Sequence, residues 1–118
     1  MSVEENKKVA TKYHELDPSN FDEILTPDFL GQHGENGFTW NLEQHRQNWT
    51  QNKGQDVIHE QFGEDNMICT RFTRTMMLQG IEISQDMLHI KTFRDGKIAH
   101  IWEYIDMQKV HEKISAKK

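Results

Sequence analysis

Hydrophobic residues recur at helical spacing in the first part of the chain. One run predicts an amphipathic helix over residues 3 to 16, and Ser2 followed by Glu5 has the spacing of a capping box at its start. Asp17-Pro18 is expected to end this helix, because a residue that precedes proline disfavours helical backbone angles.

Two more helices are expected before the middle of the chain. A short one begins at Ser19 and stops near Thr26-Pro27, and a third begins at Asn41 and ends before Asn52. The glycine-rich stretch 31–37 between them is expected to be a loop.

The pattern changes in the second half, where β-branched and aromatic residues form long runs separated by turn-like segments. These runs predict four consecutive antiparallel strands, namely Val57 to Phe62, Met67 to Leu78, Ile81 to Phe93 and Lys97 to Ile105. Asp106 is expected to cap a C-terminal helix. Helices followed by a meander predict one α+β domain over residues 1–118, with helices packed on an antiparallel sheet.

The strand from Met67 to Leu78 carries mixed residues on both of its faces. The second face of the sheet could therefore pack on another copy of the chain as a homodimer, or it could be an ordinary half-solvated face. Arg71 and Arg74 fall on opposite faces, so one of them must point inward, where it could bind a substrate oxygen. We take Arg71 as that residue; cross-strand pairing with an acid is the alternative.

Composition narrows the class of partner. Lys and Arg total 14 against 19 Asp and Glu, and this balance opposes binding to nucleic acid. No apolar run approaches the roughly 20 residues of a membrane span, and the first five residues are too acidic for a secretory signal. Together with a single cysteine, Cys69, these features predict a cytoplasmic protein. The 7 histidines are scattered without metal-binding spacing, so no metal site is expected.

His89 and Glu103 are the candidate catalytic pair, since each lies among apolar neighbours on a predicted strand. Whether they share a face depends on the turn at Asp95-Gly96. A two-residue turn puts them on opposite faces unless a bulge elsewhere corrects the register, and a three-residue turn with a bulge makes them diagonal neighbours.

Several motifs together resemble one family. They are Asp28-Phe29, His33, Gly80, Leu88-His89-Ile90, Phe93 to Ile98 (FRDGKI), Trp102-Glu103 and Asp106. In these residues the chain resembles the SnoaL-like polyketide cyclases of the nuclear transport factor 2-like superfamily. The resemblance implies a cone-like α+β barrel, in which a curved sheet encloses a cavity and commonly forms a dimer. It favours the three-residue turn.

The resemblance also implies chemistry. In such cyclases an Asp and a His transfer protons during an aldol closure, with no metal or organic cofactor, and these roles would fall on Glu103 and His89. The chain departs from the pattern in three places: Glu103 replaces the Asp, Met87 stands where Gly is frequent, and Gln85 stands where an aromatic residue is common. The implied substrate class is therefore kept broad, as a small apolar carbonyl compound.

Four more residues could bind a substrate. They are His33, Tyr13, Trp40 and Trp49, although each could equally be a surface or core side chain. Two functions follow from the same cavity: a cofactor-independent acid/base enzyme that performs cyclisation, isomerisation or hydrolysis, or a noncatalytic ligand-binding or dimerisation module. A buried Glu103 that lines a cavity without an Arg or Lys partner would favour the enzyme.

Overall fold

The computed structural model describes residues 2–105 and 115. Its elements are α1 (Val3–Tyr13), η1 (Pro18–Asn20), α2 (Phe21–Ile24), β1 (Leu25–His33), β2 (Thr39–Asn41), α3 (Leu42–Gln51), β3 (Gly54–Glu64), β4 (Met67–Leu78), β5 (Ile81–Arg94) and β6 (Lys97–Ile105). The α+β prediction is confirmed. The helix expected after Asp106 lies outside the described residues.

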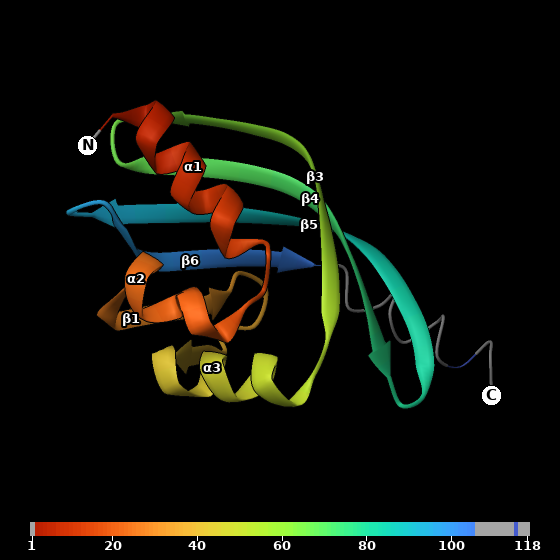
Figure 1. Ribbon diagram of the computed structural model, residues 1–118. Coiled ribbons are helices and arrows are strands. Elements are labelled where there is room, and N and C mark those ends of the chain that lie inside the picture. Colours follow the sequence, from red (N-terminus) through yellow and green to blue (C-terminus); the bar gives the residue numbers. More distant parts are fainter. Residues whose placement is uncertain (1, 106–114, 116–118) are drawn as a thin grey trace.

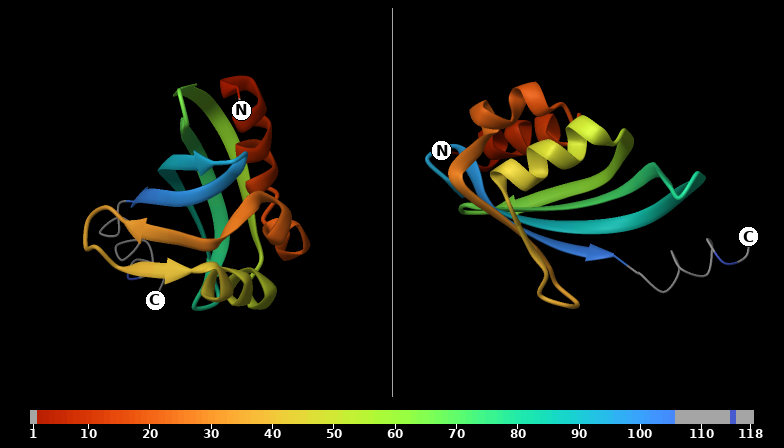
Figure 2. Two further views of the ribbon diagram at one scale, coloured as in Figure 1. Left: turned by 90° about the vertical axis from the view of Figure 1, so that its left-hand side faces the viewer. Right: turned by 90° about the horizontal axis from the view of Figure 1, so that it is seen from below.

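The strands form one open, curved sheet of 6 strands in the order β2-β1-β6-β5-β4-β3. All neighbouring pairs are antiparallel except β1 with β6, which run parallel. The three α-helices lie on the concave face, as Figures 1 and 2 show. None of the helices within the described residues is long and apolar enough to cross a membrane.

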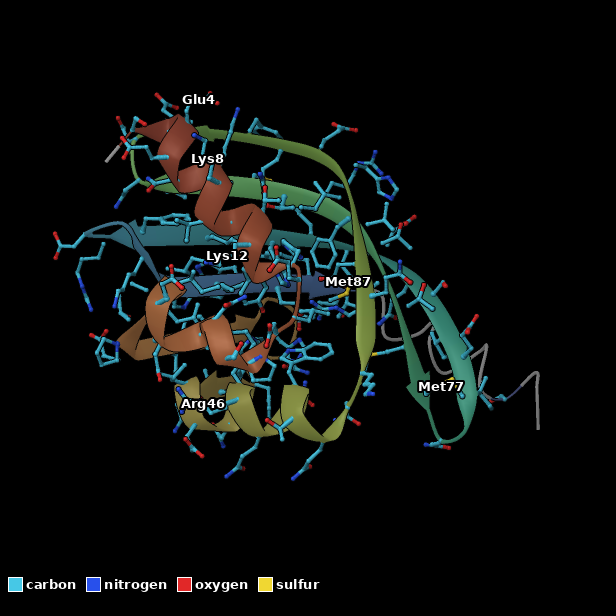
Figure 3. The ribbon with its side chains drawn as sticks, in the orientation of Figure 1. Glu4, Lys8, Lys12, Arg46, Met77 and Met87 are labelled. Carbon is cyan, nitrogen blue, oxygen red and sulfur yellow. The ribbon has the colours of Figure 1, made fainter. Side chains whose placement is uncertain are left out.

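Capping and amphipathicity explain the first helix. Ser2 and Glu5 form the predicted capping box, in which the Glu5 amide donates to Ser2 Oγ at 3.0 Å. Glu4, Lys8 and Lys12 follow one side of α1 at four-residue spacing (Figure 3). The opposite side buries Ala10 and Tyr13 against the sheet. The helix ends at Tyr13, three residues early, and Leu16 adopts a positive φ of 54°.

The sequence did not predict β1 and β2, because Pro27 and the glycines were interpreted as breakers. Pro27 is tolerated because the register between β1 and β6 is irregular from Leu25 to Leu30, so this part of the strand lacks a regular ladder. Beyond it, Leu30 to His33 pair with β6. The connecting loop is consequently 34–38 rather than 31–37, and it closes a hairpin between β1 and β2.

The turn that joins β5 to β6 decides the register of the candidate pair. Asp95 and Gly96 have φ values of 53° and 80°, and Arg94 pairs with Lys97. This is a two-residue turn of the primed type, so the prediction of a three-residue turn was wrong. A bulge follows instead at Ala99, because Phe93 pairs with Ile98 while Thr92 pairs with His100.

The bulge restores the register that the turn alone would lose. His89 lies directly opposite Glu103 in the ladder, with both side chains on the concave face under the helices. The core beside them is built from aromatic and branched side chains of α1, α2, β1 and the sheet, such as Phe21, Phe29 and Ile101.

Candidate functional site

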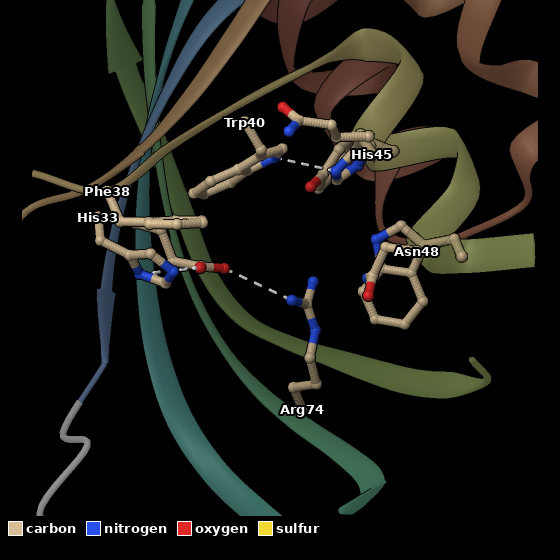
Figure 4. A pocket seen from close by; sticks show the side chains of 10 residues that line it. His33, Phe38, Trp40, His45, Asn48 and Arg74 are labelled. Carbon is tan, nitrogen blue, oxygen red and sulfur yellow. Dashed lines mark hydrogen bonds and ion pairs between the residues drawn. The ribbon is translucent and has the colours of Figure 1, made fainter. Parts of the chain in front are cut away.

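A cavity of about 310 Å³ lies between α3, the β1–β2 hairpin and the concave face of the sheet. Its lining residues are Tyr13, His33, Phe38, Trp40, Gln44, His45, Asn48, Trp49, Arg74 and Glu103. Figure 4 shows Phe38 and Trp40 across the cavity from Arg74, and Glu103 is the second charged group of the lining. The pocket is mostly aromatic with a few convergent polar groups, and its volume is at the small end of the range for ligand sites. Such a pocket suits a small planar ligand.

Glu103 is held on one side and open on the other. Its Oε1 lies 2.9 Å from His89 Nε2 and 3.5 Å from Arg74 Nη1. Its Oε2 lies 3.4 Å from His33 Nδ1, beyond a good hydrogen bond, and Glu103 lines the cavity. The carboxylate is thus fixed in direction while one oxygen remains available to a ligand.

His89 lies behind Glu103 and has no exposed surface. Burial lowers the pKa of His89 well below its usual value, and the charges of Lys91, His14 and Arg74 act in the same direction. The neutral ring donates from Nε2 to Glu103, which leaves Nδ1 buried without a partner among the described residues. This geometry makes His89 a support for the carboxylate.

Arg74 binds a second carboxylate more tightly than it binds Glu103. Its Nε and Nη2 donate to the two oxygens of Asp56 at 2.8 and 2.9 Å, a bidentate pair whose carboxylate is fully buried. The guanidinium also stacks over Trp49, 4.8 Å from the ring centre. Arg74 is therefore a rigidly held positive charge in the cavity wall.

The buried polar cluster continues away from the cavity. Asp56 Oδ2 lies 2.7 Å from His14 Nδ1, and Lys91 Nζ lies 2.9 Å from His14 Nε2. Lys91 also donates to Thr70 at 3.0 Å and has no exposed surface. A neutral His14 that donates to Asp56 and accepts from Lys91 satisfies all three groups.

Electrostatics in this cluster follow from burial. Burial lowers the pKa of Lys91 well below its usual value, and the positive charge of Arg74 lowers it further. Burial also lowers the pKa of His14 to about 3. For Asp56, burial acts to raise the pKa, but hydrogen bonds from Arg74 and His14 outweigh it and bring the pKa to about 2.

Trp40 forms the roof of the cavity because Gly31 leaves room for it. A Cβ at Gly31 would lie 2.1 Å from Trp40 Cε2, so the indole rests directly on the backbone of β1. The Trp40 indole nitrogen then donates to His45 Nδ1 on α3 at 3.1 Å. The hairpin and the helix are joined by this hydrogen bond.

The structure brings most of the predicted site residues together. Glu103, His33, Tyr13, Trp40 and Trp49 line the cavity, and His89 supports Glu103 from behind. Arg71 requires correction. It lies on the convex face, where it pairs with Glu60 at 2.7 Å, and Arg74 is the arginine of the cavity. The cross-strand pairing with an acid that we considered for these arginines is what Arg71 makes.

Other residues of the cluster were missed, and one of them, Lys91, had a usable signal. Lys91 shares the alternation of His89 and Phe93, which predicts an inward position for its side chain. Asp56 was missed because β3 begins at Gly54, three residues before the predicted strand. Within the part of the chain that the structure describes, no group of three or more His, Cys, Asp or Glu could hold a metal ion.

No protein-family model matches the chain, and no curated protein matches its sequence. Solved structures do match the fold. A protein from Jannaschia sp. CCS1 named as a SnoaL-like polyketide cyclase superposes with a TM-score of 0.79 at 15% identity, over 95% of this chain and 92% of that one. An epoxide hydrolase of the LEH-like type from M. tuberculosis gives a TM-score of 0.74 at 14% identity, over 90% and 86%.

A third structure contains a ligand. TerC, co-crystallised with polyporic acid, gives a TM-score of 0.72 at 20% identity, over 92% of this chain and 96% of that one. At such identities the likeness is one of fold. The chain therefore has the fold of the SnoaL-like and NTF2-like proteins, and the resemblance seen in its sequence is confirmed at that level.

Proposed function

We propose that this protein is a cofactor-independent acid/base enzyme that acts on a small carbonyl compound, with Glu103 as the general base. One observation carries the proposal: Glu103 lines the cavity with its Oε1 held by His89 and Arg74, while its Oε2 has a long contact of 3.4 Å with His33, which lines the same cavity. A carboxylate oriented in this way can take a proton from the carbon next to a carbonyl group. The cyclases and hydrolases among the structural neighbours support a fold that can house such a site.

The reaction follows from the charges around the cavity. When Glu103 removes the proton, the electron pair of the C–H bond moves into the carbonyl, and negative charge develops on its oxygen. Arg74 supplies fixed positive charge in the same cavity, and it is already oriented by Asp56. Return of the proton to another carbon gives isomerisation. Attack of the carbanion on a second carbonyl forms a C–C bond and an alkoxide, and transfer of the proton from Glu103 to that alkoxide completes aldol cyclisation.

His89 acts as a positioning residue in this proposal. Its ring is fully buried, with 4.6 Å between its centre and that of Phe72, and the described residues that line the cavity do not include it, so His89 acts on a ligand only through Glu103. The sequence left two roles open for His89, acid partner or orienting group, and the geometry supports the second.

A noncatalytic binding module is the second candidate, and the position of Arg74 favours it. From the sequence, a buried Glu103 without an Arg or Lys partner was expected to favour the enzyme. Arg74 Nη1 lies 3.5 Å from Glu103 Oε1, so this condition is not fully met. Since Arg74 uses its shorter contacts for Asp56, we give the enzyme preference. Activation of water by Glu103, as hydrolysis would require, is a variant of the same base chemistry.

Deuterium exchange tests the enzyme without knowledge of the product. The wild-type protein is incubated with 2-acetylnaphthalene in D₂O, and deuterium at the α-carbon is followed by NMR. We expect exchange above the buffer rate for the wild type, and a loss of about 100-fold or more for Glu103→Gln, which keeps the shape but not the base. His89→Phe should reduce the rate less than Glu103→Gln does. Binding of the ketone without exchange by the wild type would favour the binding module.

We also propose a homodimer through the convex face of the sheet. Phe62, Cys69, Ile90 and Trp102 are paired neighbours across β3 to β6 and form an apolar row on that face. Phe62 is 61% exposed, and Tyr104 on the same face is 39% exposed. Sedimentation equilibrium should give a dimer for the wild type and a monomer for Ile90→Lys. A monomeric wild type at micromolar concentration would refute this proposal.

A further inference from the structure

His45 is a buried polar residue in the cavity wall that has no role in the proposed reaction. It lies on α3, and its ring stacks on Tyr13 with 5.4 Å between the ring centres and 14° between the planes. The ring centres of Phe21 and Phe29 lie 4.9 and 5.5 Å from that of His45. His45 is 4% exposed and lines the same cavity as Glu103.

Trp40 fixes the tautomer of His45. An indole N–H can only donate, so His45 Nδ1, 3.1 Å away, must accept and cannot carry a proton. In the neutral ring the proton is then on Nε2. Burial keeps the ring neutral, because it lowers the pKa of His45 to about 3, and the charge of Arg74 adds to this effect.

The Nε2–H group has no acceptor within the part of the chain that the structure describes. Among the described residues no atom accepts from His45 Nε2, although that nitrogen is fully buried. A buried donor without a partner is costly, typically by more than an ordinary hydrogen bond contributes, and polar atoms left in this state are rare in folded proteins. The arrangement is therefore suited to an acceptor brought by a ligand.

We propose that His45 Nε2–H is the hydrogen-bond donor for the carbonyl oxygen of the ligand, and that the ligand is an aromatic ketone or a related planar carbonyl compound. The inference rests on the proposed function, because it places the carbonyl that Glu103 would activate. His45 on α3 and Glu103 on β6 both line the one cavity. The rings of Phe38, Trp40 and Trp49 provide flat apolar walls for the rest of the molecule.

Binding affinities test this inference apart from catalysis. The Glu103→Gln protein, which cannot turn the ketone over, is titrated with 2-acetylnaphthalene and with 2-ethylnaphthalene, which has a similar shape but no carbonyl. The ketone should bind about 5- to 10-fold more tightly, the ratio expected from one ordinary hydrogen bond. Adding His45→Phe should remove this preference, while His45→Gln, which retains an N–H donor, should keep part of it.

NMR of the His45 ring, in protein that retains His45, tests the same inference if the His45→Phe variant fails to fold. In protein labelled with ¹⁵N-histidine, the His45 signals should show a proton on Nε2 and none on Nδ1. Addition of the ketone should shift the Nε2 resonance, and 2-ethylnaphthalene should not.

Three results would overturn the inference: a proton on Nδ1, equal binding of the two probes, or absence of ketone binding to folded protein. These outcomes are separate from those of the exchange experiment. Selective ketone binding through His45 without deuterium exchange in the wild type would refute the general base and leave His45 as the ligand's donor.

Discussion

Arg74 and Arg71 provide a matched test of the buried ion pair, because they lie on the same strand and face opposite sides of the sheet. Arg74 is 7% exposed and its partner Asp56 is fully buried, whereas Arg71 is 48% exposed and its partner Glu60 is 62% exposed. The substitution Arg74→Met leaves a buried carboxylate without its cation, which typically costs about 3–5 kcal/mol. The same change at Arg71 breaks a surface pair and should cost about 1 kcal/mol or less.

Urea unfolding followed by tryptophan fluorescence measures both variants. At about pH 7 we expect the midpoint of Arg74→Met to fall well below that of Arg71→Met, and a thermal midpoint lower by roughly 10–20 °C. Equal losses of stability in the two variants would refute the reasoning. So would an Arg74→Met protein that matches the wild type, since the pair with Asp56 would then contribute nothing.

The pH dependence of the free energy of unfolding tests the Arg74–Asp56 pair independently. The folded pKa of Asp56, about 2, is below that of an unfolded Asp, roughly 3.9. Asp56 therefore stabilises the wild type above about pH 4, by roughly 2 kcal/mol, and this contribution is lost as the pH falls toward 2. Without Arg74, Asp56 should take up a proton more readily in the folded protein. The stability gap between wild type and Arg74→Met should then be smaller at about pH 4.5 than at about pH 7, and a constant gap would contradict this account.

Two further predictions concern Lys91 and Gly31. Because burial lowers the pKa of Lys91 in the folded protein, the unfolded chain binds one more proton, so the stability of the wild type should rise with pH between about 7 and 10. Urea titrations should show a flatter rise for Lys91→Met. An unchanged slope would show that Lys91 keeps its charge in the folded protein. Gly31→Ala should displace Trp40, because the added Cβ would lie 2.1 Å from the indole. We expect the free energy of unfolding to fall by roughly 1–3 kcal/mol. The ¹⁵N-histidine spectrum should also show that the Trp40–His45 hydrogen bond is lost. A spectrum like that of the wild type would contradict the displacement of Trp40.

The sequence predicted those helices and strands whose ends are set by neighbouring residues. The capping boxes at Ser2 and Asn41 set the starts of α1 and α3. The run of β4 ends before the turn at Gln79-Gly80, and the run of β6 begins after the turn at Asp95-Gly96. Hydrophobic alternation also placed His89 among core residues. These features depend on residues within a few positions of each other, so one sequence is enough to find them.

The strands β1 and β2 could not be found in the same way. Pro27 and Gly31 weaken a strand when they are judged alone. They are accepted here because the pairing with β6 is irregular around Pro27 and because Trp40 covers Gly31. Pairing between segments about 70 positions apart in the numbering, such as Gln32 and Trp102, leaves no local pattern. The sequence therefore named Trp40 as a candidate but did not predict the two strands that place it as the roof of the cavity.

The sequence by itself determined that helices precede a meander, that the chain has the SnoaL-like fold, and which imidazole and carboxylate are the candidates. The tertiary structure decided that they meet, through a bulge at Ala99 that compensates the two-residue turn. It also decided that Arg74 rather than Arg71 lines the cavity, and that Asp56, His14, Lys91 and His45 are buried beside the candidate pair. The physical reason is that register and burial depend on partners distant in sequence, and a shift of one residue moves every side chain of a strand to the other face.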